Sequence, residues 1–426
     1  MKNDLTEIAP TTEEQTFLRT VERRNGLLFC VAMALGYFAA PVTYVGMTHA
    51  ALCARLGASA TISNLPVAFT TIGLLAPFLA AWLFAFRLER AVVVWCAAVT
   101  SAVMAAMTVS LISSGSSVFL IVATIGVAFL VGILGNVQMV YLFQCLKRGT
   151  TEVGRNRALK ITYTIGPMCA VAGSLTAQGL LGGRIGHLSF PLDFASLFLI
   201  GVPCALGTAL AASEMKMISV PDKPHLPFLG YLRESFAGAI RSRALIVLSI
   251  AYVIYNAGVS ANANLALYGK YAMSTRPELM LGYMLAFRFG FKSLSGYCFG
   301  LVAQKRGNRA TLILIQLGMM VSVVWAAVVT GNWYLLAFAF MGASELGGAY
   351  FPNYCMSLSS YEEGARNLSL ITLVSALAIA APPIHGGLAD LFGFRSSFLF
   401  TFLCGAVTIW LLLKLPADRK KASPSA

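Results

Sequence analysis

Three charged side chains, Arg288, Lys292 and Glu345, lie in the middle of long apolar stretches of this sequence. A charged group inside a membrane costs at least about 2.5 to 3.5 kcal/mol, so such groups usually face a cavity or one another. Arg288 and Lys292 are four residues apart and share one face of a helix. At about 1.5 Å per residue, Arg288, Lys292 and Glu345 lie ~13, ~19 and ~18 Å from the outer ends of their segments. We therefore expect contact between them.

These groups are suited to binding an anion. Arg288 offers a planar fork that matches a carboxylate or phosphate, and Lys292 offers a movable point charge. Glu345 could neutralise one cation while the site is empty, or take up a proton. The alternative is a structural ion pair that fixes helix register, with the third charge reaching water.

Polar and aromatic side chains recur on other apolar segments, where a polar group without a partner would be costly. We expect them either to contact a solute, to form hydrogen bonds between helices, or, for the tyrosines, to pack at the membrane interface. The candidates for solute contact are Tyr37 and Tyr44 in the first segment, Asn136 and Gln138 in the fourth, and Tyr255, Asn256 and Asn262 in the seventh.

The composition shows what must position these groups. Of 426 residues, 58% are hydrophobic and only 11% charged, whereas soluble proteins have roughly a quarter charged. The chain is too apolar for a soluble protein, and its surface must be covered by a lipid bilayer.

Apolar segments with a length near the 20 residues of a membrane helix recur twelve times, at about 27–48, 60–85, 91–112, 118–143, 158–182, 193–213, 244–266, 279–303, 310–330, 333–358, 367–388 and 396–415. Membrane barrels would show shorter, alternating segments, so we predict an all-α multi-pass protein with twelve transmembrane helices.

The net charge of +14 could suggest nucleic acid, but the placement of the cations argues otherwise. Of the 31 Lys and Arg residues, 24 lie on the side of the two termini and 5 on the other. Cytoplasmic loops carry such an excess, so both termini and the central loop are predicted to be cytoplasmic, in a cell (plasma or inner) membrane, with no nucleic-acid partner. The mixed charges of the first 26 residues do not resemble a signal peptide.

The segments fall into two sets of six, separated by a polar stretch. We predict a cytoplasmic tail at 1–26, a six-helix bundle at 27–213, a cytoplasmic loop at 214–243, a second bundle at 244–415 and a tail at 416–426. A shift of 210 residues pairs Gly132 with Gly342, Cys145 with Cys355 and Thr162 with Thr372. Repeated halves related by pseudo-symmetry are a transporter architecture.

Three motifs resemble those of the major facilitator superfamily. The first runs from Gly300 through Gln304, Arg306 and Gly307 to Arg309, and is similar to the loop signature of the family, with Gln304 in place of the usual acid. The second, Gly166-Pro167, is similar to a motif of the exporters of the family, and the third, Gly386 to Arg395, to a common closing segment. The resemblance implies two six-helix bundles that alternate access to a central cavity lined by the first, fourth, seventh and tenth segments.

Gly347 and Gly348 directly after Glu345, like Gly166-Pro167, mark places where a helix can bend or a neighbour can approach closely. Static packing would explain them equally well.

No motif for an enzyme, a cofactor or a metal is present. The sequence has no Walker-type Gly-Lys-Ser/Thr, no HExxH and no GxSxG, so we expect a gradient as the energy source. We predict a monomeric secondary active transporter of a small organic solute, anionic or zwitterionic, coupled to H⁺. A proton-antiporting drug or metabolite exporter, a passive facilitator, and a transporter-like sensor or assembly factor remain alternatives.

Overall fold

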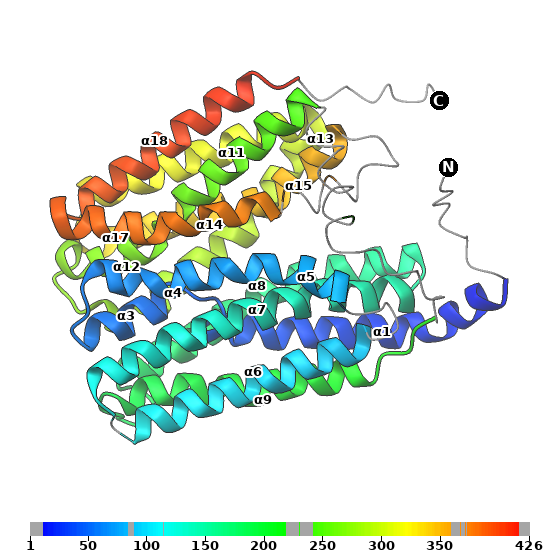
Figure 1. Cartoon of the computed structure of the whole chain (residues 1–426), viewed down its shortest axis with the longest axis horizontal. Helices are drawn as coiled ribbons and strands as arrows, with labels where there is room; N and C mark the ends of the chain where they lie inside the picture. Colours follow the sequence, from blue (N-terminus) through cyan, green and yellow to red (C-terminus); the bar gives the residue numbers. More distant parts are fainter. Residues whose placement is uncertain are drawn as a thin grey trace. The chain divides into compact units, whose positions relative to one another are not determined.

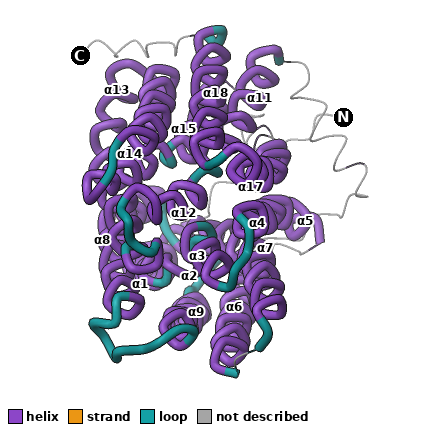
Figure 2. Tube along the Cα trace, turned by 90° about the vertical axis from the view of Figure 1, so that its left-hand side faces the viewer, coloured by secondary structure: helices purple, strands orange, loops and turns teal. Residues whose placement is uncertain are grey.

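The computed structural model describes residues 12–83, 89–113, 115–218, 230, 242–358, 367, 371 and 373–416. The described residues form helices joined by short turns, with no strand among them (Figure 2). The all-α prediction is therefore confirmed. Eight helical stretches in this part of the chain are long and apolar enough to cross a membrane. The number of twelve crossings stays a prediction.

The chain separates into two compact units. Unit 1 comprises residues 1–57 and 69–228, and unit 2 comprises 58–68 and 229–426. The helix that begins at Ala60 thus starts in unit 2 and ends in unit 1. The bundle boundaries predicted from the sequence stay a prediction.

Unit 1 is built mainly from long helices. Its elements are α1 (Thr12–Phe38), α2 (Ala40–Thr43), α3 (Met47–Arg55), the end of α4 (Ala60–Ile72), η1 (Gly73–Leu75), α5 (Ala76–Leu83), α6 (Glu89–Ile112), α7 (Ser117–Gly149), α8 (Glu152–Leu181) and α9 (Leu192–Ser213). Two of these helices begin at hydroxyl N-caps, which satisfy backbone N–H groups that have no partner within the helix. Ser116 accepts from Phe119 N at 3.2 Å, and Thr151 accepts from Gly154 N at 3.1 Å.

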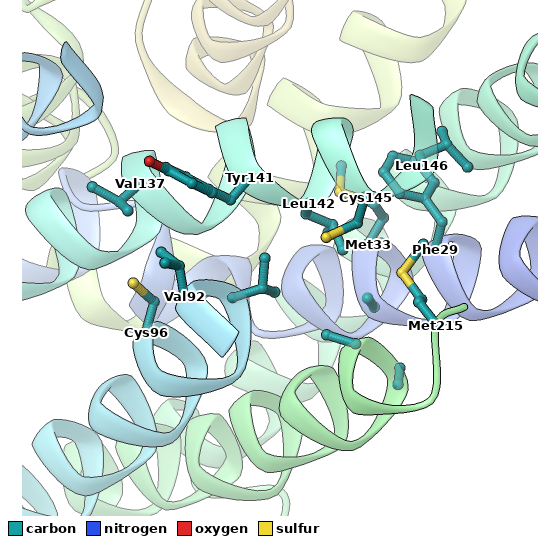
Figure 3. Packing of buried hydrophobic residues seen from close by; sticks show 14 of the residues in the cluster. Phe29, Met33, Val92, Cys96, Val137, Tyr141, Leu142, Cys145, Leu146 and Met215 are labelled. Carbon is teal, nitrogen blue, oxygen red and sulfur yellow. The ribbon is translucent and has the colours of Figure 1, made fainter. Parts of the chain in front are cut away.

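Side-chain packing holds unit 1 together. The helix α6 packs against α7 and α9, and α1 packs against α8 and α9 (Figure 1). Their shared core includes Phe29 and Met33 from α1, Val92 from α6, and Tyr141 and Cys145 from α7 (Figure 3). Because helices in lipid gain little from the hydrophobic effect, close packing of this kind must supply much of the association energy.

Unit 2 contains more interrupted helices. Its elements are the start of α4, α11 (Arg243–Val259), α12 (Asn262–Ala272), η3 (Pro277–Leu279), α13 (Leu281–Val328), η4 (Gly331–Leu335), α14 (Leu336–Ser344), α15 (Gly347–Leu358), η5 (Ala376–Ala380), α17 (Ala381–Phe392) and α18 (Phe394–Leu413). The helix α13 packs against α14 and α18, and α11 packs against α18.

Two predicted segments of unit 2 are each divided into two helices. The seventh segment breaks between Val259 and Asn262, and the tenth breaks between Ser344 and Gly347. The eighth and ninth segments are two helices that share the label α13, and they meet at Gly307, whose backbone is non-helical. The two breaks determine where the polar groups of this unit lie.

Candidate functional site

Arg288, Lys292 and Glu345 are in contact, as their positions in the sequence predicted. Glu345 lies in the break between α14 and α15, whereas both cations project from α13. The Arg288 guanidinium donates through Nε and Nη2 to Glu345 Oε1, and Lys292 Nζ lies 3.1 Å from Glu345 Oε2. Each carboxylate oxygen therefore faces a cation. We call these three residues the triad.

A glycine allows the two helices to approach at this level. A Cβ atom at position 342 would lie 2.0 Å from the Arg288 carbonyl oxygen, so only glycine fits this contact. Gly342 is three residues before Glu345, about one turn of helix, and Glu345 therefore faces the same turn of α13. The close contact of the backbones explains why the side-chain carboxylate reaches Arg288.

The break in the seventh segment supplies a third donor to the carboxylate. Asn262 begins α12, and its Nδ2 atom donates to Glu345 Oε1 at 3.2 Å and to the carbonyl of Val259 at 3.0 Å. An amide that bridges a free carbonyl and a carboxylate satisfies polar groups at a helix break inside an apolar environment. In the structure, Asn262 thus contacts Glu345. Contact between Asn262 and a solute stays a prediction.

The triad is buried unequally. The side chains of Arg288 and Glu345 are 5% and 6% exposed, and that of Lys292 is 19% exposed. With both bases and the acid ionised, the formal charge is +1. Buried ions keep their charge only when good contacts offset the cost of leaving water, and here one carboxylate serves two cations. The arrangement is therefore suited to accept a further negative group.

Tyr255 lies beside the triad but is 2% exposed. Its hydroxyl donates to the carbonyl of Ser344 at 2.9 Å, and its ring lies against Gly347. The neighbouring Gly348 has open space where a Cβ would be, with no atom within 4 Å. The two glycines that the sequence marked together thus have different surroundings.

The other amide candidates are partly satisfied within their own helices. Asn256 donates to the carbonyl of Tyr252 at 2.8 Å in α11, and Asn136 donates to that of Gly132 at 2.7 Å in α7. Gln138 is half-buried on α7. Bonds to the carbonyl four residues earlier are a common way to satisfy a polar side chain in a helix. Solute contact by these residues stays a prediction.

The candidates in the first segment lie in unit 1. Tyr37 is half-buried, and its ring covers Gly166, where a Cβ would lie 2.5 Å from ring carbons. Tyr44 is 40% exposed at the end of α2. Pro167 lies inside α8. Packing against the Tyr37 ring therefore explains why position 166 is a glycine. This explanation is independent of the exporter motif that Gly166 and Pro167 resemble.

The loop signature forms the interruption of α13. Gly307 has φ 85° and ψ 173°, a conformation that is essentially restricted to glycine. Arg309 donates from Nη1 to the carbonyl of Leu415, beyond the end of α18, at 2.8 Å. This contact ties the turn to the last helix of unit 2.

Within the described part of the chain, Gly300 and Arg306 of the signature make no comparable contact. A Cβ added at Gly300 would have only the Tyr350 hydroxyl nearby, at 4.0 Å, and Arg306 is exposed. The side chain of Gln304 lies outside the described residues.

The sequence did not reveal a buried polar network in unit 2. Asn64 donates to Asn264 Oδ1 at 2.7 Å, and Asn264 donates to Ser397 Oγ at 2.9 Å. His385 Nε2 lies 2.9 Å from the carbonyl of Ala257 and must donate to it, so Nδ1 accepts from Ser397 Oγ at 2.7 Å. The only signal in the sequence was polar residues within apolar segments, which does not identify partners.

A carboxylate caps the start of α4 in the same unit. Asp390 accepts from the backbone N–H groups of Ala60 at 2.9 Å and Thr61 at 2.8 Å, and from the Thr61 hydroxyl at 2.5 Å. Gly386 makes room for this contact, because a Cβ there would lie 2.5 Å from Thr61 Cα. Acidic groups are favourable at helix N-termini, so Asp390 anchors this segment.

In the described part of the chain, no group of three His, Cys, Asp or Glu side chains could hold a metal.

No protein-family model matches the sequence. No curated protein matches it either. Solved structures do match the fold. They include a D-xylose-proton symporter (13% identity, 95% of this chain and 99% of that chain, TM-score 0.66), the peptide transporter POT in complex with sulfate (15%, 95% and 97%, 0.65) and the nucleoside transporter NupG (10%, 92% and 97%, 0.61).

At these identities the likeness establishes the fold. The chain has the fold of major facilitator superfamily transporters, as its motifs predicted. With its long apolar helices, it is a multi-pass membrane protein. The three proteins compared are transporters and not enzymes.

Proposed function

We propose that the chain is a secondary active transporter of a small organic anion or zwitterion, which works by alternating access and is coupled to protons. The observation that carries this proposal is the triad, in which Arg288 and Lys292 both contact the carboxylate of Glu345. A fold shared with sugar, peptide and nucleoside transporters supports secondary transport in general. The charge of the triad supports the class of solute.

An anionic group of the solute competes with Glu345 for the cations. The Lys292 side chain is more exposed than that of Arg288, at 19% against 5%, and makes the first contact. Arg288 then binds the group through its planar fork, because a guanidinium and a carboxylate or phosphate form two parallel hydrogen bonds.

Proton coupling follows from the charge of the site. Without a proton, Glu345 and an incoming anion would compete for Arg288 and Lys292. When Glu345 takes up a proton, it no longer neutralises a cation and the solute replaces it. A monoanion bound together with one proton leaves the formal charge at +1, so no additional buried charge is created.

The same charges disfavour a lipophilic cation as solute. A site for such a cation needs an excess of buried acid, and the triad has an excess of base. This argument favours an anion or zwitterion over a cationic drug, and it applies to import and export alike.

The distribution of Lys and Arg supports an orientation with both termini and the 214–243 loop in the cytoplasm. We place the protein in a cell membrane as a monomer, with the 27–213 and 244–415 segments as its two bundles.

A ligand screen tests the class of solute. Purified protein is heated with panels of small organic anions, zwitterions, cations and neutral sugars, because a ligand raises stability by about RT ln(1 + [L]/Kd). We expect anions or zwitterions to raise the melting temperature of the wild type and to have no effect on Arg288→Gln. Lys414→Gln is the matched control, because Lys414 lies over the Trp410 ring at the end of α18. Stabilisation by cations or sugars that persists in Arg288→Gln would contradict the proposal.

A further inference from the structure

The break that carries Glu345 is held by a side chain from another helix. In a continuous helix the N–H of Gly348 would bond to the carbonyl of Ser344. Here it bonds to the carbonyl of Glu345, at 3.1 Å. The Ser344 carbonyl instead accepts from the Tyr255 hydroxyl at 2.9 Å. Tyr255 thus supplies a donor at the point where the helix loses one.

The ring of Tyr255 fixes the other side of the break. A Cβ at position 347 would lie 2.5 Å from Tyr255 Cζ and 2.7 Å from its hydroxyl oxygen, so α15 begins in direct contact with the ring. The ring is itself held in place, with its centroid 5.2 Å from that of Phe351 and 6.0 Å from that of Tyr252. One side chain therefore contacts both ends of the two-residue break.

We infer that Tyr255 is a positioning residue for Glu345. Through the Ser344 carbonyl and Gly347, it fixes the break in the geometry that places the carboxylate between Arg288 and Lys292. This role rests on the proposed function of the triad. It replaces the direct contact with the solute that the sequence suggested, because a tyrosine that is only 2% exposed is poorly placed to touch a solute. The hydroxyl and the ring both contribute.

A double-mutant cycle tests this role without any solute. Melting temperatures are measured for the full-length wild type, Tyr255→Phe, Glu345→Gln and the double variant. Glu345→Gln removes the negative charge that both cations contact and lowers the melting temperature. If Tyr255 positions the carboxylate, Glu345→Gln lowers the melting temperature by less in the Tyr255→Phe background than in the wild type. Additive shifts, as found for independent sites, would overturn the inference.

Tyr354→Phe is the matched control for the cycle. Tyr354 is also fully buried, and its hydroxyl also donates to a backbone carbonyl, that of Pro416, at the end of the chain's last helix. We expect the shifts in melting temperature caused by Tyr354→Phe and by Glu345→Gln to be additive. If Tyr354→Phe reduced the effect of Glu345→Gln on the melting temperature as strongly as Tyr255→Phe does, the loss of any buried tyrosine hydroxyl would be sufficient for this reduction. That result would overturn the inference.

Two adjacent glycines give a second test if Tyr255→Phe does not fold. Gly347→Ala places a methyl group into the Tyr255 ring, whereas Gly348→Ala places it in open space. We expect Gly347→Ala to reduce the effect of Glu345→Gln and Gly348→Ala to leave it intact. Equal behaviour of the two variants would overturn the inference. Since no solute enters these measurements, a failure of the transport proposal would be seen separately, in the ligand screen.

Discussion

Gly342 lies directly against the backbone of Arg288, with its missing Cβ position 2.0 Å from the Arg288 carbonyl oxygen and 2.8 Å from Arg288 Cα. This contact between α14 and α13 sets the distance at which Glu345 meets the two cations. The contact gives a prediction about stability, because neither partner atom belongs to a flexible side chain.

Gly342→Ala should force α13 and α14 apart. Overpacking in a tightly packed site costs about 1 to 3 kcal/mol, so we expect a clear fall in the melting temperature of the purified protein. Gly290→Ala is the control, since Gly290 lies on α13 with no atom within 4 Å of its Cβ position. That variant should melt at or above the wild-type temperature because alanine is the better helix former. Equal melting of both variants would show that the close contact is not required.

Gly307→Ala should strain the turn inside α13. With φ 85° and ψ 173°, Gly307 has a backbone conformation that costs other residues about 1 to 3 kcal/mol. We expect a lower melting temperature and faster amide exchange near Thr311, whose hydroxyl donates to the Gly307 carbonyl. Gly296→Ala, in open space on the same helix, should show neither effect. A wild-type melting temperature for Gly307→Ala would contradict this conformation.

Asp390→Ala should loosen the start of α4. The carboxylate satisfies the N–H groups of Ala60 and Thr61, and loss of a helix cap costs about 0.5 to 2 kcal/mol. Hydrogen exchange measured by mass spectrometry should rise for residues 60–64. The start of α7, which Ser116 caps independently, should exchange at the wild-type rate in the same sample. Unchanged exchange at 60–64 would mean that Asp390 does not anchor this segment.

Glu345→Gln should separate exchange from accumulation. A glutamine cannot carry the proton, but both cations remain available to the solute. In proteoliposomes loaded with the anion that stabilises the protein best, we expect counterflow exchange to persist and accumulation driven by a pH gradient to disappear. Accumulation at the wild-type level would exclude Glu345 as the proton carrier.

The sequence predicted the contact of the triad because charge in an apolar segment is rare and costly. The depths of Arg288, Lys292 and Glu345 along their helices then made contact between them geometrically possible. The offset of 210 residues also paired Gly342 with Gly132. In unit 1, Gly132 likewise lies against a backbone, with its Cβ position 2.7 Å from the Thr70 carbonyl oxygen. Close helix contacts thus left a signal in the sequence.

Other features of the site could not be predicted in this way. The breaks at 259–262 and 344–347 contain no proline. Gly347 and Gly348 marked the second as a place where a helix can bend, although static packing would explain them equally well, and no such pair marked the first. The breaks are stabilised by Tyr255 and Asn262, whose partners lie more than 80 residues away in the chain. The network of Asn64, Asn264 and His385 depends on tertiary contacts in the same way. Polarity in an apolar segment indicates that a partner exists without identifying it.

The requirement for Arg288 in transport is the most direct test of the proposed function. Exchange of the stabilising anion is measured in proteoliposomes containing equal amounts of wild type, Arg288→Gln or Lys414→Gln, after each variant has been shown to insert and fold. We predict that Arg288→Gln abolishes exchange and that Lys414→Gln exchanges at the wild-type rate. Exchange by Arg288→Gln at the wild-type rate would contradict the assignment of the triad as the solute site.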